Sequence, residues 1–204
     1  MIEFLFSQYK EYSNFLIALE LIAVVFGVIS VLFARKNNIL VYPTGLVSTI
    51  LYVYILFEFQ LYGDLIINFY YTIMSFLGWY LWSKTKDGED EFPISTINRK
   101  EILVSTLIFT ITLTFVALVY HFFDKFTDWT AYVDALTTGL FFVGMWLMAK
   151  RKIENWILWI IADAISIPLY FYKGLTFSSF QFILFTIIAI LGYKEWKRFL
   201  QKTI

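Results

Sequence analysis

Five side chains of one apolar segment repeat at the spacing of a helix face, and they are the residues best suited to chemistry in this sequence. Trp156, Trp159, Asp163, Ser166 and Tyr170 follow one another at intervals of three or four residues, which places them on one side of a helix. This face combines aromatic rings, a carboxylate and hydroxyls. Polar side chains are costly in hydrocarbon, so such a face normally lines a cavity or a bundle interior.

Three other apolar segments carry shorter faces of the same kind. Their hydroxyl, phenol and amide groups belong to Ser48 and Tyr52, Asn68 and Tyr71, and Gln181. Aromatic walls with a few polar contacts are the usual construction of a small-molecule site. A cation gains roughly 0.5–2 kcal/mol from aromatic faces, and Asp163 would balance its charge. The pattern therefore favours a planar cationic heterocycle that carries a sugar or a hydroxyl group.

Each of these residues also has a purely structural interpretation. Trp156 lies near the expected membrane boundary, where tryptophan commonly anchors a span. Asp163 could bond to a hydroxyl of a neighbouring helix, and Asn68 and Gln181 could join helices by hydrogen bonds. The hydroxyls of Ser and Thr could bond to the backbone of their own helix.

Seven apolar stretches would position these side chains. A helix needs about 20 mostly apolar residues to cross a bilayer, and only helices satisfy their own backbone at such lengths in lipid. Of the 204 residues, 60% are hydrophobic and 22% are aromatic. The fold is predicted to be an all-α integral membrane protein with seven transmembrane helices. The expected spans are 15–34, 39–57, 65–82, 102–122, 130–149, 155–172 and 177–193.

The composition excludes several classes of function. Sixteen basic and sixteen acidic residues balance, so we expect no nucleic-acid partner, which would require a lopsided basic face. The absence of Cys and the single His121 leave no thiolate nucleophile and no imidazole cluster for zinc. The nearest acid pair, Asp124 and Asp128, lies outside the spans, whereas a membrane enzyme needs a nucleophile with its base or clustered acids. We therefore expect neither an enzyme nor a cofactor.

Basic residues indicate the orientation. Thirteen Lys and Arg residues fall on one side of the seven spans and three on the other. Because cytoplasmic loops retain such residues, the C-terminus is predicted to be cytoplasmic and the N-terminus outside. Trp82 and Trp196 lie at basic span ends and are expected to be interfacial. The acidic run at 87–91 is expected to be solvated within the long loop 83–101 rather than to bind a metal.

The two halves of the chain repeat at an offset of 114 or 115 residues. Ala-Arg-Lys at 34–36 returns as Ala-Lys-Arg at 149–151, and Gly-x-x-x-Trp at 78–82 returns at 192–196. The span 102–122 is then a linker, which gives a parallel 3+1+3 repeat, and transporter repeats commonly hold a substrate site at their interface. The expected domains are an interfacial segment 1–14, a first three-helix repeat 15–82, a cytoplasmic loop 83–101, a linker helix and outer loop 102–129, a second repeat 130–196 and a cytoplasmic tail 197–204.

Several motifs resemble the PnuC family of bacterial vitamin transporters, and the resemblance extends over about residues 15–200. The motifs are Trp-x-x-Trp at 156–159 with Asp163 one turn later, Leu-Tyr-x-Tyr-Lys-Gly-Leu at 169–175, Gly-Tyr-Lys-x-Trp at 192–196, Leu-Tyr-Gly-Asp at 61–64, and Asn68. The resemblance implies a fold similar to that of SWEET sugar transporters and a homotrimer. It further implies passive uptake of nicotinamide riboside across the bacterial inner membrane, made one-way by a cytoplasmic kinase that phosphorylates the vitamin.

The resemblance also implies that Trp156 and Trp159 contact the ligand, and we expect both to stack the pyridinium ring. Asp163, Ser166, Asn68 and Gln181 would then orient the amide and the ribose. The chain departs from the family pattern at Tyr42-Pro43, where relatives often have Trp-Pro, and at Asn68, where they tend to have Gln. Related transporters carry thiamine or riboflavin, so the vitamin stays open. Ion coupling also stays open and would need an acid, namely Glu20, Asp134 or Asp163.

Overall fold

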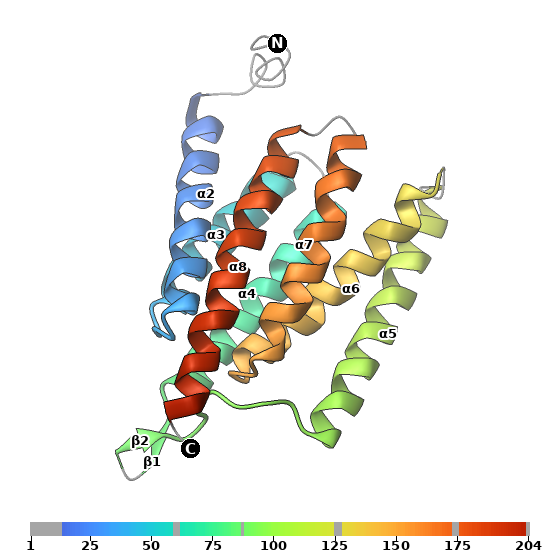
Figure 1. The fold of residues 1–204 in the computed structure, drawn as a ribbon. Helices are drawn as coiled ribbons and strands as arrows, with labels where there is room; N and C mark the ends of the chain where they lie inside the picture. Colours follow the sequence, from blue (N-terminus) through green and yellow to red (C-terminus); the bar gives the residue numbers. More distant parts are fainter. Residues whose placement is uncertain (1–13, 59–61, 87, 125–127, 173–175, 203–204) are drawn as a thin grey trace. The chain divides into compact units, whose positions relative to one another are not determined.

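The computed structural model describes residues 14–58, 62–86, 88–124, 128–172 and 176–202. Within these ranges it has seven long helices and one short hairpin (Figure 1). The helices are α2 (Asn14–Arg35), α3 (Val41–Glu58), α4 (Tyr62–Trp82), α5 (Arg99–Phe122), α6 (Thr130–Ala149), α7 (Glu154–Tyr172) and α8 (Thr176–Lys202), and the strands are β1 (Thr85–Lys86) and β2 (Glu89–Asp90). The all-helical prediction is therefore confirmed.

The helix ends agree with the expected spans to within three residues, with one exception. Helix α8 continues to Lys202 instead of ending at 193. Among the described residues, α2, α3, α5, α6 and α7 are long and apolar enough to cross a membrane. Residues 1–13 of the expected interfacial segment 1–14, and residues 59–61 and 173–175, lie outside the described residues.

The chain divides into two compact units, and the first contains α2, α3 and most of α4. Small residues line its helix crossings. A Cβ added at Gly45 of α3 would lie 3.0 Å from Ser30 Oγ of α2, and one added at Gly27 would lie 3.0 Å from Ser48 Oγ. Ser30 Oγ donates a hydrogen bond to the Val41 carbonyl at 2.7 Å. Such small residues let helix backbones approach closely, as is usual in membrane bundles.

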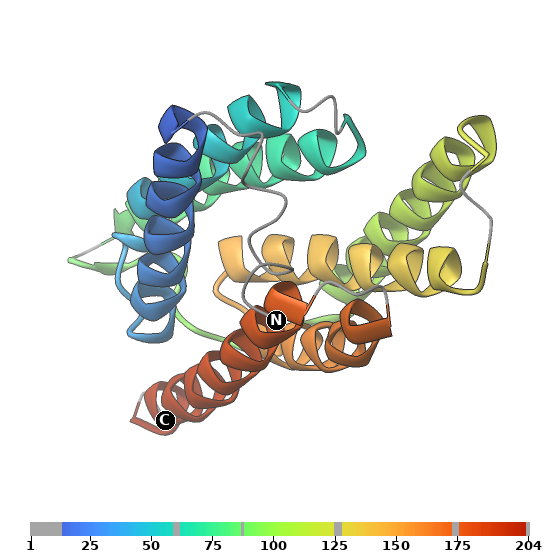
Figure 2. The same cartoon turned by 90° about the horizontal axis from the view of Figure 1, so that it is seen from above.

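The second unit contains α5, α6, α7, α8 and the hairpin, together with residues 35–37 and the end of α4. Helix α6 packs against both α5 and α7, and α8 packs against α7 (Figure 2). In the most apolar 18-residue stretch of α6, half of the residues are buried, whereas in that of α5 only 11% are buried. Thr106, Thr110 and Thr114 of α5 donate to the carbonyls four residues earlier, at 3.0, 2.9 and 2.9 Å. For these threonines the own-backbone interpretation is confirmed.

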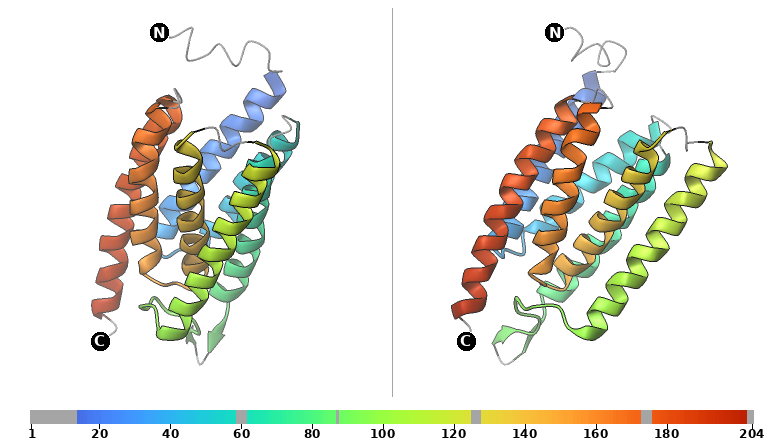
Figure 3. Two further views of the ribbon diagram at one scale, coloured as in Figure 1. Left: turned by 90° about the vertical axis from the view of Figure 1, so that its right-hand side faces the viewer. Right: turned by 45° about the vertical axis from the view of Figure 1, so that its right-hand side comes forward.

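One end of the second unit gathers the hairpin, the start of α5, the turn from α6 to α7 and the end of α8 (Figure 3). The hairpin pairs Thr85 with Asp90 and Lys86 with Glu89. Its turn contains Gly88 at φ 85°, a conformation that a side chain makes costly. Glu89 and Asp90 of the acidic run, which was predicted to be a solvated loop, form the second strand of this hairpin and are exposed.

The two units share local features at an offset of 114 residues. Asn37, in the turn from α2 to α3, has φ 52°, and Arg151, in the turn from α6 to α7, has φ 50°. The next amides also correspond, because Asn38 N donates to Phe33 O at 3.0 Å and Lys152 N donates to Leu147 O at 2.9 Å. These matched turns support the predicted repeat.

An aromatic residue packs against a glycine in each unit, again 114 residues apart. A Cβ at Gly78 of α4 would overlap the Tyr42 ring, and a Cβ at Gly192 of α8 would lie 2.7 Å from the Trp156 ring. Both aromatic residues lie in the first turn of their helices. Tyr42, which departs from the family pattern, thus occupies the place that Trp156 has in the second unit.

Candidate functional site

The predicted face of α7 is buried within the second unit. Trp156, Asp163 and Ser166 have relative exposures of 0%, 3% and 1%. Trp159 and Tyr170 are partly exposed. Isoleucines occupy the opposite side of the helix, where Ile157 and Ile161 are exposed. The helical spacing therefore identified the inward side of α7 correctly, with its two indoles toward the N-terminal end and its acid one turn beyond them.

The two tryptophans of α7 meet edge to face. Their ring centroids are 5.6 Å apart, with an interplanar angle of 81°. Trp156 also meets Trp196 of α8 edge to face at 5.5 Å and rests on Gly192. Its buried Nε1 has no hydrogen-bond partner among the described residues. The Trp159 indole lies against Gly144 of α6, where a Cβ would overlap Nε1 and Cδ1.

A second aromatic group lies further along the same helix face. Tyr170 of α7 meets Phe182 of α8 at 4.9 Å, and Phe182 stacks with Phe141 of α6 at 6.2 Å. Asp163 and Ser166 come between this group and the tryptophan pair along α7. The predicted Gln181 precedes Phe182 and is partly exposed. Along α7, the buried carboxyl and hydroxyl thus lie between two groups of aromatic side chains.

Asp163 has no cationic partner in the described part of the chain. Ion pairs among the described residues include those of Arg35 with Glu195, Arg151 with Asp90, and Lys152 with Glu101. A carboxylate buried away from water is costly unless a charge or hydrogen bonds compensate it. With Trp159 one turn away and Trp156 two turns away, this arrangement can bind a flat ring and pair with its positive charge.

The first unit holds the other predicted site residues. Ser48 is buried beside Gly27, and Tyr52 is partly exposed. In α4, the backbone carbonyl of Asn68 accepts a hydrogen bond from the Thr72 hydroxyl at 2.9 Å. The centroid of the Tyr71 ring lies 6.0 Å from that of the Tyr70 ring. Each of the two sets of residues is described within its own unit, so their meeting in one pocket stays a prediction.

Trp82 and Trp196 are buried, so the prediction that they are interfacial is wrong. Their relative exposures are 2% and 0%, and their rings lie 6.0 Å apart. Arg151 lies over the Trp82 ring, with its guanidinium carbon 4.3 Å from a ring centroid. Aromatic contacts therefore run from Arg151 through Trp82, Trp196 and Trp156 to Trp159.

Arg151 is the centre of a cluster that the sequence analysis missed. Its side chain is 4% exposed, pairs with Asp90 at 2.6 Å and donates to the Phe92 carbonyl at 3.0 Å. Only its place in a basic run was noted from the sequence. The signal that could have revealed it is the repeat itself, because Arg151 occupies the left-handed turn position of Asn37.

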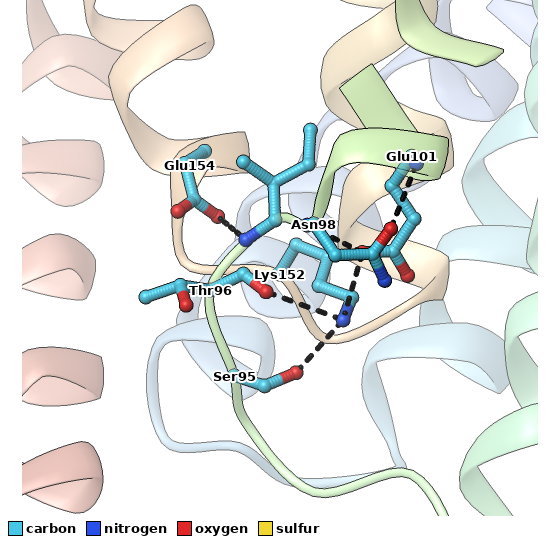
Figure 4. Close-up of polar contacts among 7 residues, drawn as sticks. Ser95, Thr96, Asn98, Glu101, Lys152 and Glu154 are labelled. Carbon is cyan, nitrogen blue, oxygen red and sulfur yellow. Dashed lines mark hydrogen bonds and ion pairs between the residues drawn. The ribbon is translucent and has the colours of Figure 1, made fainter. Parts of the chain in front are cut away.

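Lys152 and Glu154 attach the segment before α5 to the same turn (Figure 4). Lys152 Nζ lies 3.0 Å from Ser95 Oγ and 3.1 Å from Glu101 Oε2. The Ile97 amide donates to Glu154 Oε2 at 3.0 Å. The Asn-x-x-Glu sequence that starts with Asn98 is a capping box, with both of its hydrogen bonds at 3.0 Å, and this pattern is readable from sequence.

Comparisons with known proteins agree with this architecture. The family described as "Nicotinamide mononucleotide transporter" matches residues 17–198. The chain is 25% identical over 205 residues to "Nicotinamide riboside transporter PnuC" of Escherichia coli (strain K12), an alignment that covers 87% of this chain and 84% of the relative. A protein of the same name from Neisseria mucosa is 26% identical over 194 residues, which is 89% of this chain and 72% of the relative.

A more distant relative and a solved structure complete the comparison. "Riboflavin/roseoflavin transporter RibM" of Streptomyces davaonensis is 26% identical over 124 residues, which is 58% of this chain and 56% of the relative. The structure "Crystal structure of the Vitamin B3 transporter PnuC" matches with a TM-score of 0.67 and 23% identity, covering 90% of this chain and 82% of that chain. With the apolar helices, these matches indicate a multi-pass membrane protein. The chain belongs to the nicotinamide mononucleotide transporter family.

Proposed function

We propose that this chain is a facilitative transporter of nicotinamide riboside in the bacterial inner membrane, with its principal contacts on α7. Its relatives in Escherichia coli and Neisseria mucosa are named for that vitamin. The observation that carries the proposal is the buried Asp163, which has no cationic partner among the described residues and lies one turn from Trp159. Nicotinamide riboside has a flat cationic ring and a hydroxylated sugar, so it supplies the missing charge.

The two tryptophans take different parts in this proposal. Trp159 is partly exposed and can stack the pyridinium ring without moving. Trp156 has no exposed surface, so the direct contact expected for it requires α8 to shift away. In the conformation described here, Trp156 supports Trp159, and its unpaired Nε1 is a donor available to a ligand once α8 shifts.

The remaining predicted contacts come from several helices. Ser166 of α7 and Gln181 of α8 would orient the ribose and the amide, with further contacts from Asn68, Tyr71, Ser48 and Tyr52 of the first unit. We propose that the fold is a parallel 3+1+3 repeat, built like that of SWEET transporters with α5 as the linker. The 114-residue correspondence of turns and of aromatic and glycine contacts supports this repeat. Repeat interfaces are the usual location of transporter substrate sites.

The transport step needs no covalent chemistry. We propose passive alternating access, with a cytoplasmic kinase trapping the vitamin by phosphorylation and with the carrier assembled as a homotrimer. The C-terminus would be cytoplasmic and the N-terminus outside. The start of α5, the turn from α6 to α7 and the end of α8, which carry Lys and Arg residues, gather at one end of the second unit, and cytoplasmic loops retain such residues. The mass of the purified protein in detergent tests the trimer, and a mass of one chain contradicts it.

Ligand binding to the purified carrier tests the proposed function. We expect nicotinamide riboside to raise the melting temperature more than thiamine, riboflavin or nicotinamide mononucleotide. Trp159→Ala should weaken nicotinamide riboside binding about tenfold, because base stacking on an aromatic side chain contributes roughly 1–3 kcal/mol. Trp129→Ala is the control, since Trp129 is exposed and packs against Tyr172. An affinity of Trp159→Ala within twofold of the parent contradicts the placement of Trp159 at the ligand.

Riboflavin is the second candidate, because RibM is a relative over 58% of this chain. The riboflavin ring is neutral, so it supplies no positive charge to pair with the carboxylate. Stabilisation by riboflavin but not by nicotinamide riboside would therefore identify a riboflavin carrier. Thiamine, which is cationic, is distinguished from nicotinamide riboside by the same panel of ligands.

A further inference from the structure

The interior of α6 contains two glycines, Gly139 and Gly144, which need a physical reason. Glycine inside a helix costs about 1 kcal/mol relative to alanine. Each of these glycines faces an aromatic ring of a neighbouring helix. A Cβ at Gly139 would lie 2.8 Å from the Phe109 ring of α5, and a Cβ at Gly144 would overlap the Trp159 indole of α7. Gly144 therefore makes the room that the five-membered ring of Trp159 occupies.

The Trp159 ring is also held on a second side. Trp156 meets it edge to face with a centroid distance of 5.6 Å. Trp156 is completely buried and packs against Trp196 and Gly192 of α8, so it cannot yield without moving α8. A methyl group at position 144 would therefore push the Trp159 ring toward its exposed side.

Helix packing alone does not require glycine at position 144. The corresponding residues of the first unit, 114 positions earlier, are Ser30 and Gly45, which face each other. There the glycine lies on the second helix of the repeat and the larger residue on the first helix, which is the reverse of Gly144 and Trp159. The glycine at 144 is thus explained by the indole at 159 and not by the helix crossing itself.

We propose that Gly144 is a positioning residue for the substrate, which sets ligand affinity by fixing the orientation of the Trp159 indole without touching the ligand. This inference rests on the proposed function, in which Trp159 stacks the flat ring. The overlap of a Cβ at 144 with Nε1 and Cδ1 and the fixed Trp156 are the observations that carry it. A stacked ring loses contact when its platform tilts, so the affinity depends on this glycine.

Isothermal titration of nicotinamide riboside into Gly144→Ala and Gly139→Ala tests the proposal. Both variants add one methyl group to the same helix against an aromatic ring, but Gly139 faces α5. We expect the Kd to rise about tenfold in Gly144→Ala and less than twofold in Gly139→Ala. In transport assays, Gly144→Ala should raise KM and leave the maximal rate within twofold. An unchanged Kd in Gly144→Ala overturns the proposal.

A double-mutant cycle separates positioning from other effects. In a Trp159→Ala background, Gly144→Ala should change the Kd by less than twofold, because the ring it acts through is absent. A full tenfold effect in that background overturns the proposal. The double variant Gly144→Ala, Trp159→Phe has a ring that lacks the indole Nε1. It should recover at least half of the affinity that Gly144→Ala alone loses. No recovery overturns the proposal as well.

A measurement without ligand distinguishes this inference from the proposed function. The fluorescence of Trp159 is obtained by subtracting the emission spectrum of a Trp159→Phe variant from that of the same protein with Trp159, once for the parent and once for Gly144→Ala. Gly144→Ala should shift this difference spectrum to the red, because the ring moves toward its exposed side, and an unshifted spectrum overturns the inference. If the parent binds no nicotinamide riboside, the proposed function fails, while the same spectrum still decides whether Gly144 holds the indole.

Discussion

The carboxyl group of Asp163 is buried inside the second unit without a cation beside it among the described residues. It is 3% exposed, and no described residue forms an ion pair with it. Removing a carboxylate from water is unfavourable unless a partner compensates for it. A permanent cation on the substrate is such a partner. Asp163 should therefore contribute to the choice between charged and neutral ligands more than any hydroxyl or amide nearby.

Asp163→Asn should weaken nicotinamide riboside binding by about tenfold or more, since contacts with a charged group contribute roughly 1.5–3 kcal/mol and about 1.4 kcal/mol is a factor of ten. The amide retains the size of the acid, so folding should be preserved. Asp134→Asn, one helix earlier, is the control and should bind normally. Calorimetry with nicotinamide riboside and with neutral nicotinamide measures the effect. Equal losses for both ligands would mean that charge is not what Asp163 recognises.

The inward residues of α7 were predictable from the sequence, but their supports were not. Trp156, Trp159, Asp163 and Ser166 are large or polar residues in an apolar segment, so their spacing alone places them on one face. Gly144 and Gly192 matter through the side chains that they lack, which no periodicity of hydrophobic residues shows. The different burial of the two tryptophans depends on where α6 and α8 approach α7, which is a tertiary property.

At the scale of elements, the segment from the hairpin to α5 is fastened to the turn between α6 and α7. The Ser95 amide donates to Arg151 O at 3.1 Å, and the Ile153 amide donates to Ser95 O at 3.0 Å. Arg151 holds the hairpin through Asp90, while Lys152 reaches Glu101 at the start of α5. Helix α5 is therefore attached to the turn between α6 and α7 by backbone and charged contacts, in addition to its packing against α6.

Replacing Arg151 should destabilise this connection far more than replacing its acidic partner. Asn keeps the left-handed backbone that Asn37 adopts in the corresponding turn, so Arg151→Asn removes the cation without backbone strain. We expect a loss of about 2 kcal/mol of unfolding free energy, from a charged hydrogen bond and a cation–π contact. Asp90 is 42% exposed, so Asp90→Asn should cost less than about 1 kcal/mol.

Thermal unfolding in detergent measures both changes, with Lys100→Ala at an exposed position as the control. Equal stability losses for Arg151→Asn and Asp90→Asn would show that the ion pair alone holds the hairpin. An Arg151→Asn protein as stable as the parent would show that the packing of Arg151 on Trp82 contributes nothing measurable.

The elements themselves were predictable to different degrees. The long helices were predictable because about 20 apolar residues in lipid leave the backbone no other arrangement. The hairpin was not, since its two-residue strands are short and polar and take their place from Arg151. Trp82 and Trp196 were misjudged because span ends usually place tryptophan at the interface, whereas here the guanidinium and the other indoles enclose them.

At the scale of the whole molecule, transport of the proposed substrate moves a positive charge across the membrane, unless another ion moves with it. One elementary charge across 100 mV corresponds to about 2.3 kcal/mol, so an inside-negative potential of that size drives about 50-fold accumulation at equilibrium. A proton gradient supplies no driving force unless an acid of the carrier exchanges protons during the cycle. Glu20, Asp134 and Asp163 are the acids within the spans suited to this role.

Purified carrier in liposomes should therefore accumulate labelled nicotinamide riboside in response to a potassium diffusion potential and not in response to a pH gradient at zero potential. Without either gradient, the internal and external concentrations should become equal, because trapping requires a kinase, which is a separate protein from the carrier. Liposomes that hold a purified riboside kinase and ATP should continue to accumulate the phosphorylated product. Accumulation driven by the pH gradient alone would refute passive transport, and loss of that response in Asp163→Asn, Glu20→Gln or Asp134→Asn would identify the coupling acid.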